Sequence, residues 1–366
     1  MKEKLKLLFK RLLLFFVGLF LFMIILGIIS VILTEDEENF FTYLYEGNTE
    51  KVLYYIKNED ININMTNERG LTPLMVSILS NYTEMAKELI NAGADINAKK
   101  IDSAFDYTPL RYASELGGNE EIVKLLIDKG ADLVITNEDG KLHTALMYTT
   151  NIYIAKMLID AGTDVHITNG AGQNALFNAI LNSSEEIVKL LIDNGIKINM
   201  KDGVGFTPLS YAALFADIKI LRLLIEAGAD VNYTGISGST ALMSSSSLEK
   251  TELLIKYGAY VNLTNRFGST ALMNASRYGR AEIVKTLIEY GALINAKNNE
   301  GKTALMYASE NGKAEVVKTL IEYGALINAK DNEGKTALMY VPANKKDTKT
   351  KKYTDTIRIL KNFGAY

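Results

Sequence analysis

The sequence predicts an all-α solenoid of stacked helix-turn-helix repeats with β-turn or hairpin tips, preceded by one N-terminal transmembrane helix. Three observations carry this prediction. The tetrapeptide Thr-Ala-Leu-Met recurs at a constant spacing, beginning at Thr270, Thr303 and Thr336. An apolar segment that closes with an aromatic residue, Gly and Ala follows each copy. A run without any charged side chain occupies residues 12–33.

Each feature of the repeat has a physical role in starting or ending a helix. Thr72, Thr108 and Thr207 are each followed by Pro, so the hydroxyl can accept a backbone N–H while Pro occupies the first helical turn. The second helix of each repeat is expected to end where a Gly can adopt the left-handed conformation. These glycines are Gly130, Gly195, Gly228, Gly258, Gly291 and Gly324.

The period, the turn signature and the two helix patterns together resemble the ankyrin repeat. The resemblance extends from about Asn67 to Tyr366 in about nine copies; besides the three above, copies start near Thr72, Thr108, Thr144, Asn174, Thr207 and Thr240. It implies a rigid stack that presents turn tips and the exposed side of the first helices as one concave surface for a protein partner. A self-associating structural envelope protein is the alternative, since the repeats at Thr270 and Thr303 are nearly identical.

The expected organisation has five parts. Residues 1–11 form a short basic cytoplasmic tail, 12–33 a signal-anchor helix, 34–66 an acidic flank with N-terminal capping helices, 67–340 the repeat stack, and 341–366 a C-terminal capping repeat with a basic loop. Two repeats, Thr144 to Asn174 and Thr240 to Thr270, are shorter than the others. In these two repeats we expect a shortened loop between the paired helices.

The apolar run at 12–33 is long enough for a membrane span, at about 33 Å as a helix against a hydrocarbon core of about 30 Å. Five basic residues precede it and an acidic stretch begins at Glu35. The positive-inside rule then predicts a single-pass protein with a cytoplasmic N-terminus and an extracytoplasmic repeat domain. A cleaved signal peptide, which would make the protein secreted, remains an alternative, although the run exceeds the usual h-region length.

Composition and motifs argue against several functional classes. A net charge of −3 gives no basic field for nucleic acid, and the absence of Cys removes thiolate chemistry and Cys-ligated metals. The two histidines, His143 and His166, are a weak metal signal. No nucleotide-binding, hydrolase or metalloprotease motif is present. We therefore expect a non-enzymatic protein without a metal or cofactor.

Candidate partner-binding residues are large side chains at positions that the repeat fold does not require. They flank the turn Gly or close the first helix, and they are Leu181, Phe206, Leu214, Phe215, Phe267, Arg277 and Tyr278. Aromatic and Arg side chains supply most interface energy, so these positions favour a partner, although packing between repeats is the competing explanation. Packing is the favoured explanation for a second series, Tyr112, Tyr148, Tyr211, Tyr307 and Tyr340.

Overall fold

The computed structural model describes residues 39–58, 61–100, 107–115, 119–136, 140–235, 237–342 and 351–366. The predicted basic tail and membrane helix, residues 1–33, lie outside the described residues. Within the described part of the chain, no helix combines the length and the apolarity that a membrane crossing requires. The chain divides into two compact units, Met1–Asn137 and Glu138–Tyr366. We call them unit 1 and unit 2.

Unit 1 consists of helix pairs, as the repeat pattern predicts. A helix at residues 39–45 precedes α2, and its Phe40 and Leu44 are fully buried together with Val52 of α2. The remaining elements are α2 (Thr49–Asn58), α3 (Pro73–Leu79), α4 (Thr83–Asn91), α5 (Pro109–Glu115), α6 (Glu120–Asp128) and the short strand β1 (Val134–Thr136). Consecutive second helices pack on one another, α2 on α4 and α4 on α6.

Unit 2 repeats the same pair seven times among its described residues, after the short strand β2 (Leu142–Thr144). The pairs are η1 (Ala145–Met147) with α7 (Ile152–Asp160), α8 (Ala175–Leu181) with α9 (Glu185–Asp193), α10 (Pro208–Leu214) with α11 (Ile218–Glu226), α12 (Ala241–Ser244) with α13 (Leu248–Lys256), α14 (Ala271–Tyr278) with α15 (Ala281–Glu289), α16 (Ala304–Glu310) with α17 (Ala314–Glu322), and η2 (Ala337–Tyr340) with α18 (Lys351–Asn362).

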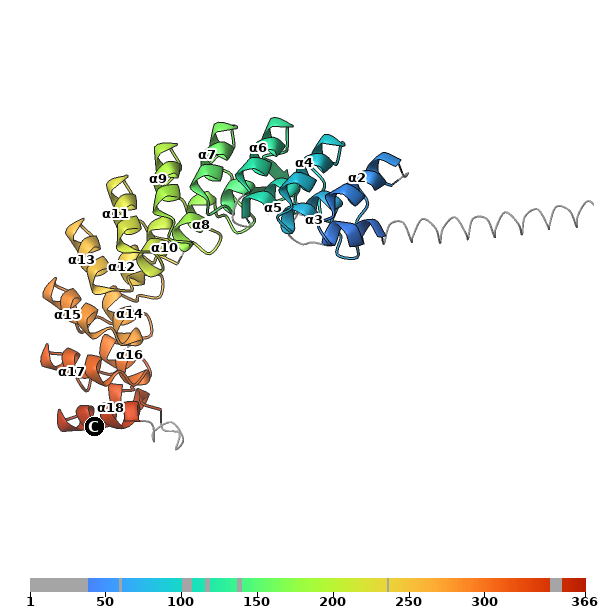
Figure 1. The fold of residues 1–366 in the computed structure, drawn as a ribbon. Helices are drawn as coiled ribbons and strands as arrows, with labels where there is room; N and C mark the ends of the chain where they lie inside the picture. Colours follow the sequence, from blue (N-terminus) through green and yellow to red (C-terminus); the bar gives the residue numbers. More distant parts are fainter. Residues whose placement is uncertain are drawn as a thin grey trace, which may run out of the picture. The chain divides into compact units, whose positions relative to one another are not determined.

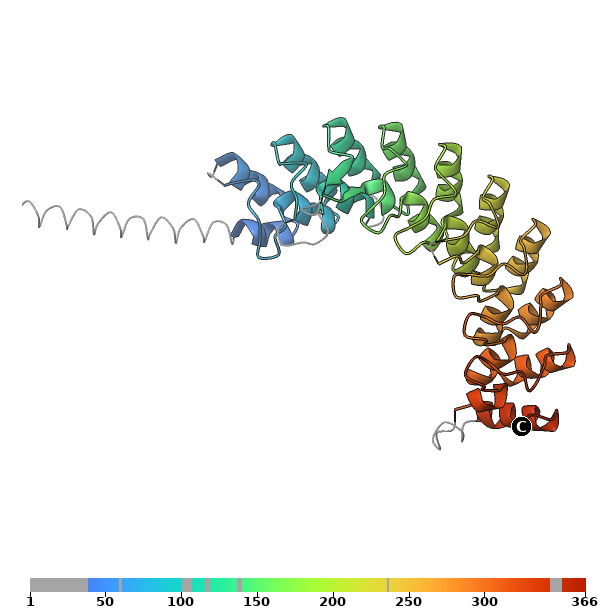
Figure 2. The same cartoon turned by 180° about the vertical axis from the view of Figure 1, so that it is seen from behind.

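Within unit 2 the first and second helices lie on opposite sides of the stack. Figures 1 and 2 show the second helices, from α9 to α17, following one another along the outer side, while the first helices and the turns line the inner side. Leu254, Val284 and Leu320 of successive second helices are fully buried between neighbouring repeats. The all-α repeat solenoid is therefore confirmed for the described residues.

The predicted helix starts and stops are also confirmed. The hydroxyl of Thr72 accepts the N–H of Met75 at 3.3 Å, and the hydroxyl of Thr207 accepts that of Ser210 at 3.1 Å. All six helix-ending glycines have positive φ, between 75° at Gly195 and 94° at Gly324. A side chain at such a position would be strained, so the sequence signal and the backbone requirement coincide.

The expectation for the two short repeats is wrong in its detail. In the repeat at Thr240 the first helix, α12, has four residues where α10 has seven, while the connection to α13 keeps its three residues. The helix has lost a turn and the loop is unchanged. Ser247 caps α13 by accepting the N–H of Lys250, so the serines between α12 and α13 form the connection and not a last helical turn. In the repeat at Thr144, Asn151 caps α7 in the same way and only the 3-10 turn η1 remains.

Candidate functional site

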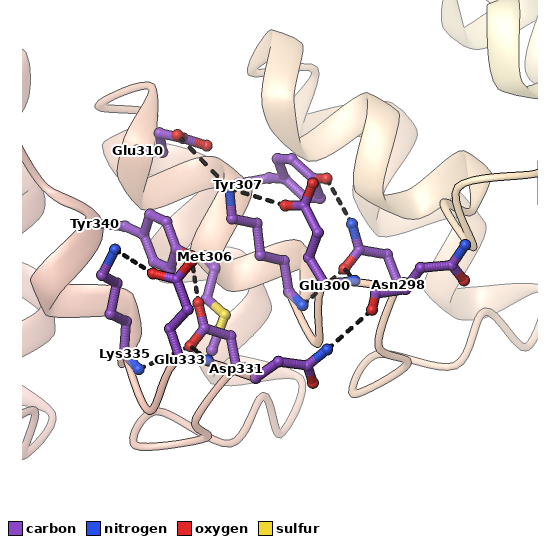
Figure 3. A network of polar contacts seen from close by, with 12 residues as sticks. Asn298, Glu300, Met306, Tyr307, Glu310, Asp331, Glu333, Lys335 and Tyr340 are labelled. Atoms are coloured by element: carbon purple, nitrogen blue, oxygen red, sulfur yellow. Dashed lines mark hydrogen bonds and ion pairs between the residues drawn. The ribbon is translucent and has the colours of Figure 1, made fainter.

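An Asx side chain fixes the turn of each repeat in the C-terminal part of unit 2. Oδ1 of Asn298 accepts the N–H groups of Glu300 at 3.0 Å and Lys302 at 2.8 Å, and Nδ2 donates to the Tyr307 hydroxyl at 2.9 Å. Figure 3 shows this network beside its counterpart one repeat later, where Tyr340 donates to Asp331. These bonds hold each turn tip against the first helix of its own repeat.

The same arrangement explains three members of the tyrosine series. The Tyr211 hydroxyl donates to Oδ2 of Asp202 at 3.0 Å, as Tyr340 does to Asp331, while Tyr307 accepts from Asn298. Burial, followed by the bond to Asp202, raises the pKa of Tyr211. The hydroxyls of these tyrosines stabilise the turns by hydrogen bonds, which agrees with the structural role expected for them.

The candidate residues of the repeat at Thr207 differ in how much they support their own fold. Phe215 caps the end of α10 and is 58% exposed, whereas Phe206 and Leu214 are half-buried. The rings of Phe206 and Phe215 both lie 5.8 Å from the Tyr211 ring, measured between centroids. Tyr211 therefore joins the two phenylalanines into one aromatic cluster, of which Phe215 is the outward member.

The candidates of the repeat at Thr270 form a second exposed group. Tyr278 ends α14 and is 61% exposed, and the exposed Arg277 beside it lies 4.4 Å above the ring of Tyr307 in the next repeat. Phe267 is exposed in the turn before α14, with the Arg266 guanidinium 5.3 Å from its ring. These side chains offer aromatic faces together with positive charge.

Leu181 lies in a different repeat from both of these groups. It is the last residue of α8, one repeat before Phe215, and nearly half of its surface is exposed. α8 packs against α10, so Leu181 belongs to the same row of first-helix ends as Phe215 and Tyr278. The structure thus places all seven candidates in unit 2, on first helices, directly after one in the case of Phe215, or on the turns that precede them.

Two cations that the sequence reasoning missed, one buried and one half-buried, lie in and beside the short repeat at Thr240. Lys250 of α13 is only 8% exposed, and its ammonium donates to the Ala213 carbonyl at 3.3 Å and to the Ser246 hydroxyl at 3.1 Å. The Arg280 guanidinium, from the next repeat, donates to the carbonyl of Ser245. Cations favour the carbonyl ends of helices, so both residues stabilise the ends of α10 and α12.

The surroundings of both cations disfavour their charged forms. Burial lowers the pKa of Lys250, with Asp217 opposing the shift and Arg280 adding to it. Burial also lowers the pKa of Arg280, whose guanidinium lies 5.1 Å from the Tyr278 ring. A sequence signal did exist, because Lys250 occupies the position that Ile283 and Val316 fill in the following repeats. A charge at an otherwise apolar position marks a local change of structure.

Phe215 and Tyr278 therefore lie on the two sides of the short repeat. Phe215 belongs to the repeat before it and Tyr278 to the repeat after it. Lys250 lies in the short repeat itself, and the half-buried Arg280 reaches back to it from the repeat of Tyr278. We call Phe215, Lys250, Tyr278 and Arg280 the short-repeat cluster. Its exposed aromatics and partly buried cations suit a binding surface.

The histidines have ordinary surroundings. Nδ1 of the buried His143 lies 2.7 Å from the Tyr148 hydroxyl, and His166 is exposed. Within the described residues, no group of three His, Cys, Asp or Glu side chains is placed to hold a metal ion.

Comparisons with known proteins agree with this geometry. The family model described as "Ankyrin repeats (3 copies)" matches residues 41–137, 142–235, 239–331 and 293–362. Human protein phosphatase 1 regulatory subunit 27 is 33% identical over 108 residues, which are 30% of this chain and 68% of that protein. Rat ankyrin repeat and SAM domain-containing protein 6 is 32% identical over 110 residues, 29% of this chain, and the match spans only 12% of that relative's length.

Proposed function

Since this chain belongs to the ankyrin-repeat family, we propose that it is a non-enzymatic scaffold whose protein partner docks on the first helices and turns of unit 2, centred on the short-repeat cluster. One observation carries the proposal: Phe215 and Tyr278 expose more than half of their surface at the ends of their helices, on either side of the repeat whose first helix, α12, ends in a run of serines. The name of one similar protein, a regulatory subunit, is consistent with a binding role.

Energetics favour these two residues as anchors. Truncating a hot-spot aromatic at an interface costs about 2 kcal/mol or more, and such residues cluster with Arg near the centre of the contact. Arg277 and Arg280 both lie near aromatic rings of this face, so a partner would meet aromatic surface and positive charge together. Phe206 and Leu214 are half-buried, and Phe206 packs against Tyr211, which in turn contacts Phe215.

A photo-cross-linking experiment tests the location of the partner. Benzoylphenylalanine introduced at Tyr278 should give one discrete protein adduct when the cells that express the protein are irradiated. The same amino acid introduced at Lys156, an exposed position on α7 on the outer side of unit 2, should give none. No adduct at Tyr278, or an equal adduct at Lys156, would count against the proposed face.

We also propose that residues 12–33 hold the repeats next to a membrane, with the repeats on the extracytoplasmic side. The support is the apolar run, the five basic residues before it and the acidic stretch after it. A scaffold held in this way would present its binding face to partners near the same membrane.

Protease accessibility tests this topology. In intact cells or spheroplasts that expose the outer leaflet, added protease should digest a tag attached after Tyr366, and the protein should resist carbonate extraction. Protection of the tag until the membrane is lysed would reverse the orientation. A mature N-terminus found near the end of the apolar run would show cleavage and a secreted protein instead.

A further inference from the structure

An apolar stripe lies at the ends of the second helices α13, α15 and α17, and it shares no residue with the short-repeat cluster. It is formed by the residue before the helix-ending Gly and the residue two positions after that Gly. The stripe consists of Tyr257, Tyr260, Tyr290, Leu293, Tyr323 and Leu326, which are 38–66% exposed. Phe363 and Tyr366 continue the pattern after α18 and are also exposed.

The five preceding repeats have small or polar residues at these positions. The residue before the Gly is Ala, Lys, Ala, Asn and Ala in turn, and the residue two positions after it is Asp, Asp, Asp, Lys and Asp. Three of those aspartates serve their own turn: Asp95, Asp164 and Asp230 each accept the N–H of the residue two positions on, at 2.8–2.9 Å. The stripe residues cannot accept such a bond.

The fold does not require the apolar side chains of the stripe. The backbone N–H groups of Tyr260 and Leu293 bond to an Asn of the preceding repeat, at 2.8 and 2.9 Å. The N–H of Asp230 makes the same bond at 3.0 Å. The backbone bond between repeats therefore forms with either residue. The C-terminal repeats have an exposed Tyr or Leu at the position where most of the preceding repeats have Asp.

Two consecutive pairs of the stripe meet at the junction of Leu293 and Tyr323. A shallow hollow of about 570 Å³ is lined by both Leu293 and Tyr323, together with the backbone around Gly324. With about 150–250 Å² available on each aromatic side chain, the exposed stripe offers on the order of 500 Å² of apolar surface. This is as large as the largest apolar patch of a typical monomer, about 300–600 Å².

The charges beside the stripe are balanced. Lys285 pairs with Glu289 at 4.0 Å and Lys318 with Glu322 at 3.7 Å, and the Tyr323 hydroxyl donates to Glu289 at 3.4 Å. An anionic membrane surface or a nucleic acid attracts surfaces with an excess of Lys and Arg. Paired charges of both signs fit a protein surface of the same mixed character.

We propose that the stripe is an interface with a second copy of this chain. Its apolar pairs recur once for each repeat of the stack, beginning at Tyr257, Tyr290 and Tyr323. A surface whose own apolar groups recur with the same rise matches consecutive pairs in register, and a second copy of this chain has that rise. Self-association through the stripe leaves the short-repeat cluster of both copies free for a different protein.

Single-cysteine cross-linking in native membranes tests this interface, because the chain contains no Cys of its own. Leu293→Cys in the full-length protein should give a dimer with a flexible bismaleimide. The control Tyr153→Cys, at an exposed position on α7 outside the stripe, should give at least fivefold less. Equal yields would indicate random collision and overturn the proposal.

A second variant separates the interface from folding. Adding Tyr260→Asp and Leu326→Asp to Leu293→Cys restores the residue found in other repeats, so the melting temperature should not fall. The dimer yield should drop at least fivefold. An unchanged yield would refute the interface, as would a main adduct with a different protein. Protection of Leu293→Cys from an aqueous maleimide without any dimer would assign the stripe to lipid and refute the second copy.

Discussion

Deletion of residues 354–366 is expected to lower the melting temperature of the protein and to make it aggregate. α18 packs against α17, and its Thr356 and Leu360 are fully buried. Without them the apolar side of α17, which carries the buried Leu320 and the half-buried Ile321, would face water. In a stack each repeat is stabilised by its neighbours, so uncovering one face destabilises the whole end of the array.

The expected loss is at least about 3 kcal/mol, because burying one large aliphatic side chain is worth roughly 1.5–3 kcal/mol and α18 covers several groups. Thermal unfolding of the detergent-solubilised protein, followed by circular dichroism, measures this loss of stability. Light scattering of the same sample measures aggregation. Arg358→Ala is the matched control, since that side chain is 69% exposed and pairs only with Asp355 among the ion pairs of the described part of α18. Unchanged melting and monodispersity after the deletion would show that α18 does not protect the stack.

The parts of the fold that could be predicted are those that local chemistry determines. Thr72 before Pro73 marks the start of a helix. Gly195, whose φ is 75°, marks the end of one. Each repeat boundary is therefore visible in a few residues. The recurrence of these signals then gives the order of the stack without any long-range information.

In the short repeat at Thr240, the local sequence pattern was insufficient to predict the lengths of the elements. Its reduced length revealed a deletion but not which element was shortened. The outcome depends on competition between the serines as helix residues and Ser247 as the cap of α13. Lys250 could be recognised as unusual from the sequence, but its acceptor Ala213 belongs to the preceding repeat and becomes a neighbour only when the repeats stack.

The exposed fraction of each candidate side chain likewise could not be predicted from the sequence. Phe206 and Phe215 are the same residue type at equivalent distances from Tyr211, yet only Phe215 is mostly exposed. The turn position of Phe206 turns its ring towards the first helix, where it packs edge-on against Tyr211. Loop position alone does not separate a supporting ring from a contact ring.

The double substitution Phe215→Ala with Tyr278→Ala tests the proposed binding function most directly. Both side chains are mostly solvent-exposed, so their removal should leave the melting temperature nearly unchanged. At an interface, their loss should weaken binding by about 2 kcal/mol or more, roughly a 30-fold increase in Kd. Tyr153→Ala on α7, which removes an equally exposed aromatic from the outer side, should change neither quantity.

The decisive measurement is the Kd of the photo-cross-linked partner for the double variant, taken together with the variant's thermal unfolding curve. We expect a Kd at least about 30-fold weaker, with a melting temperature within a few degrees of the unsubstituted protein. A fall in melting temperature of about 10 °C or more, with binding lost only as folding is lost, would show that Phe215 and Tyr278 are packing residues. An unchanged Kd would place the partner elsewhere and contradict the proposed face.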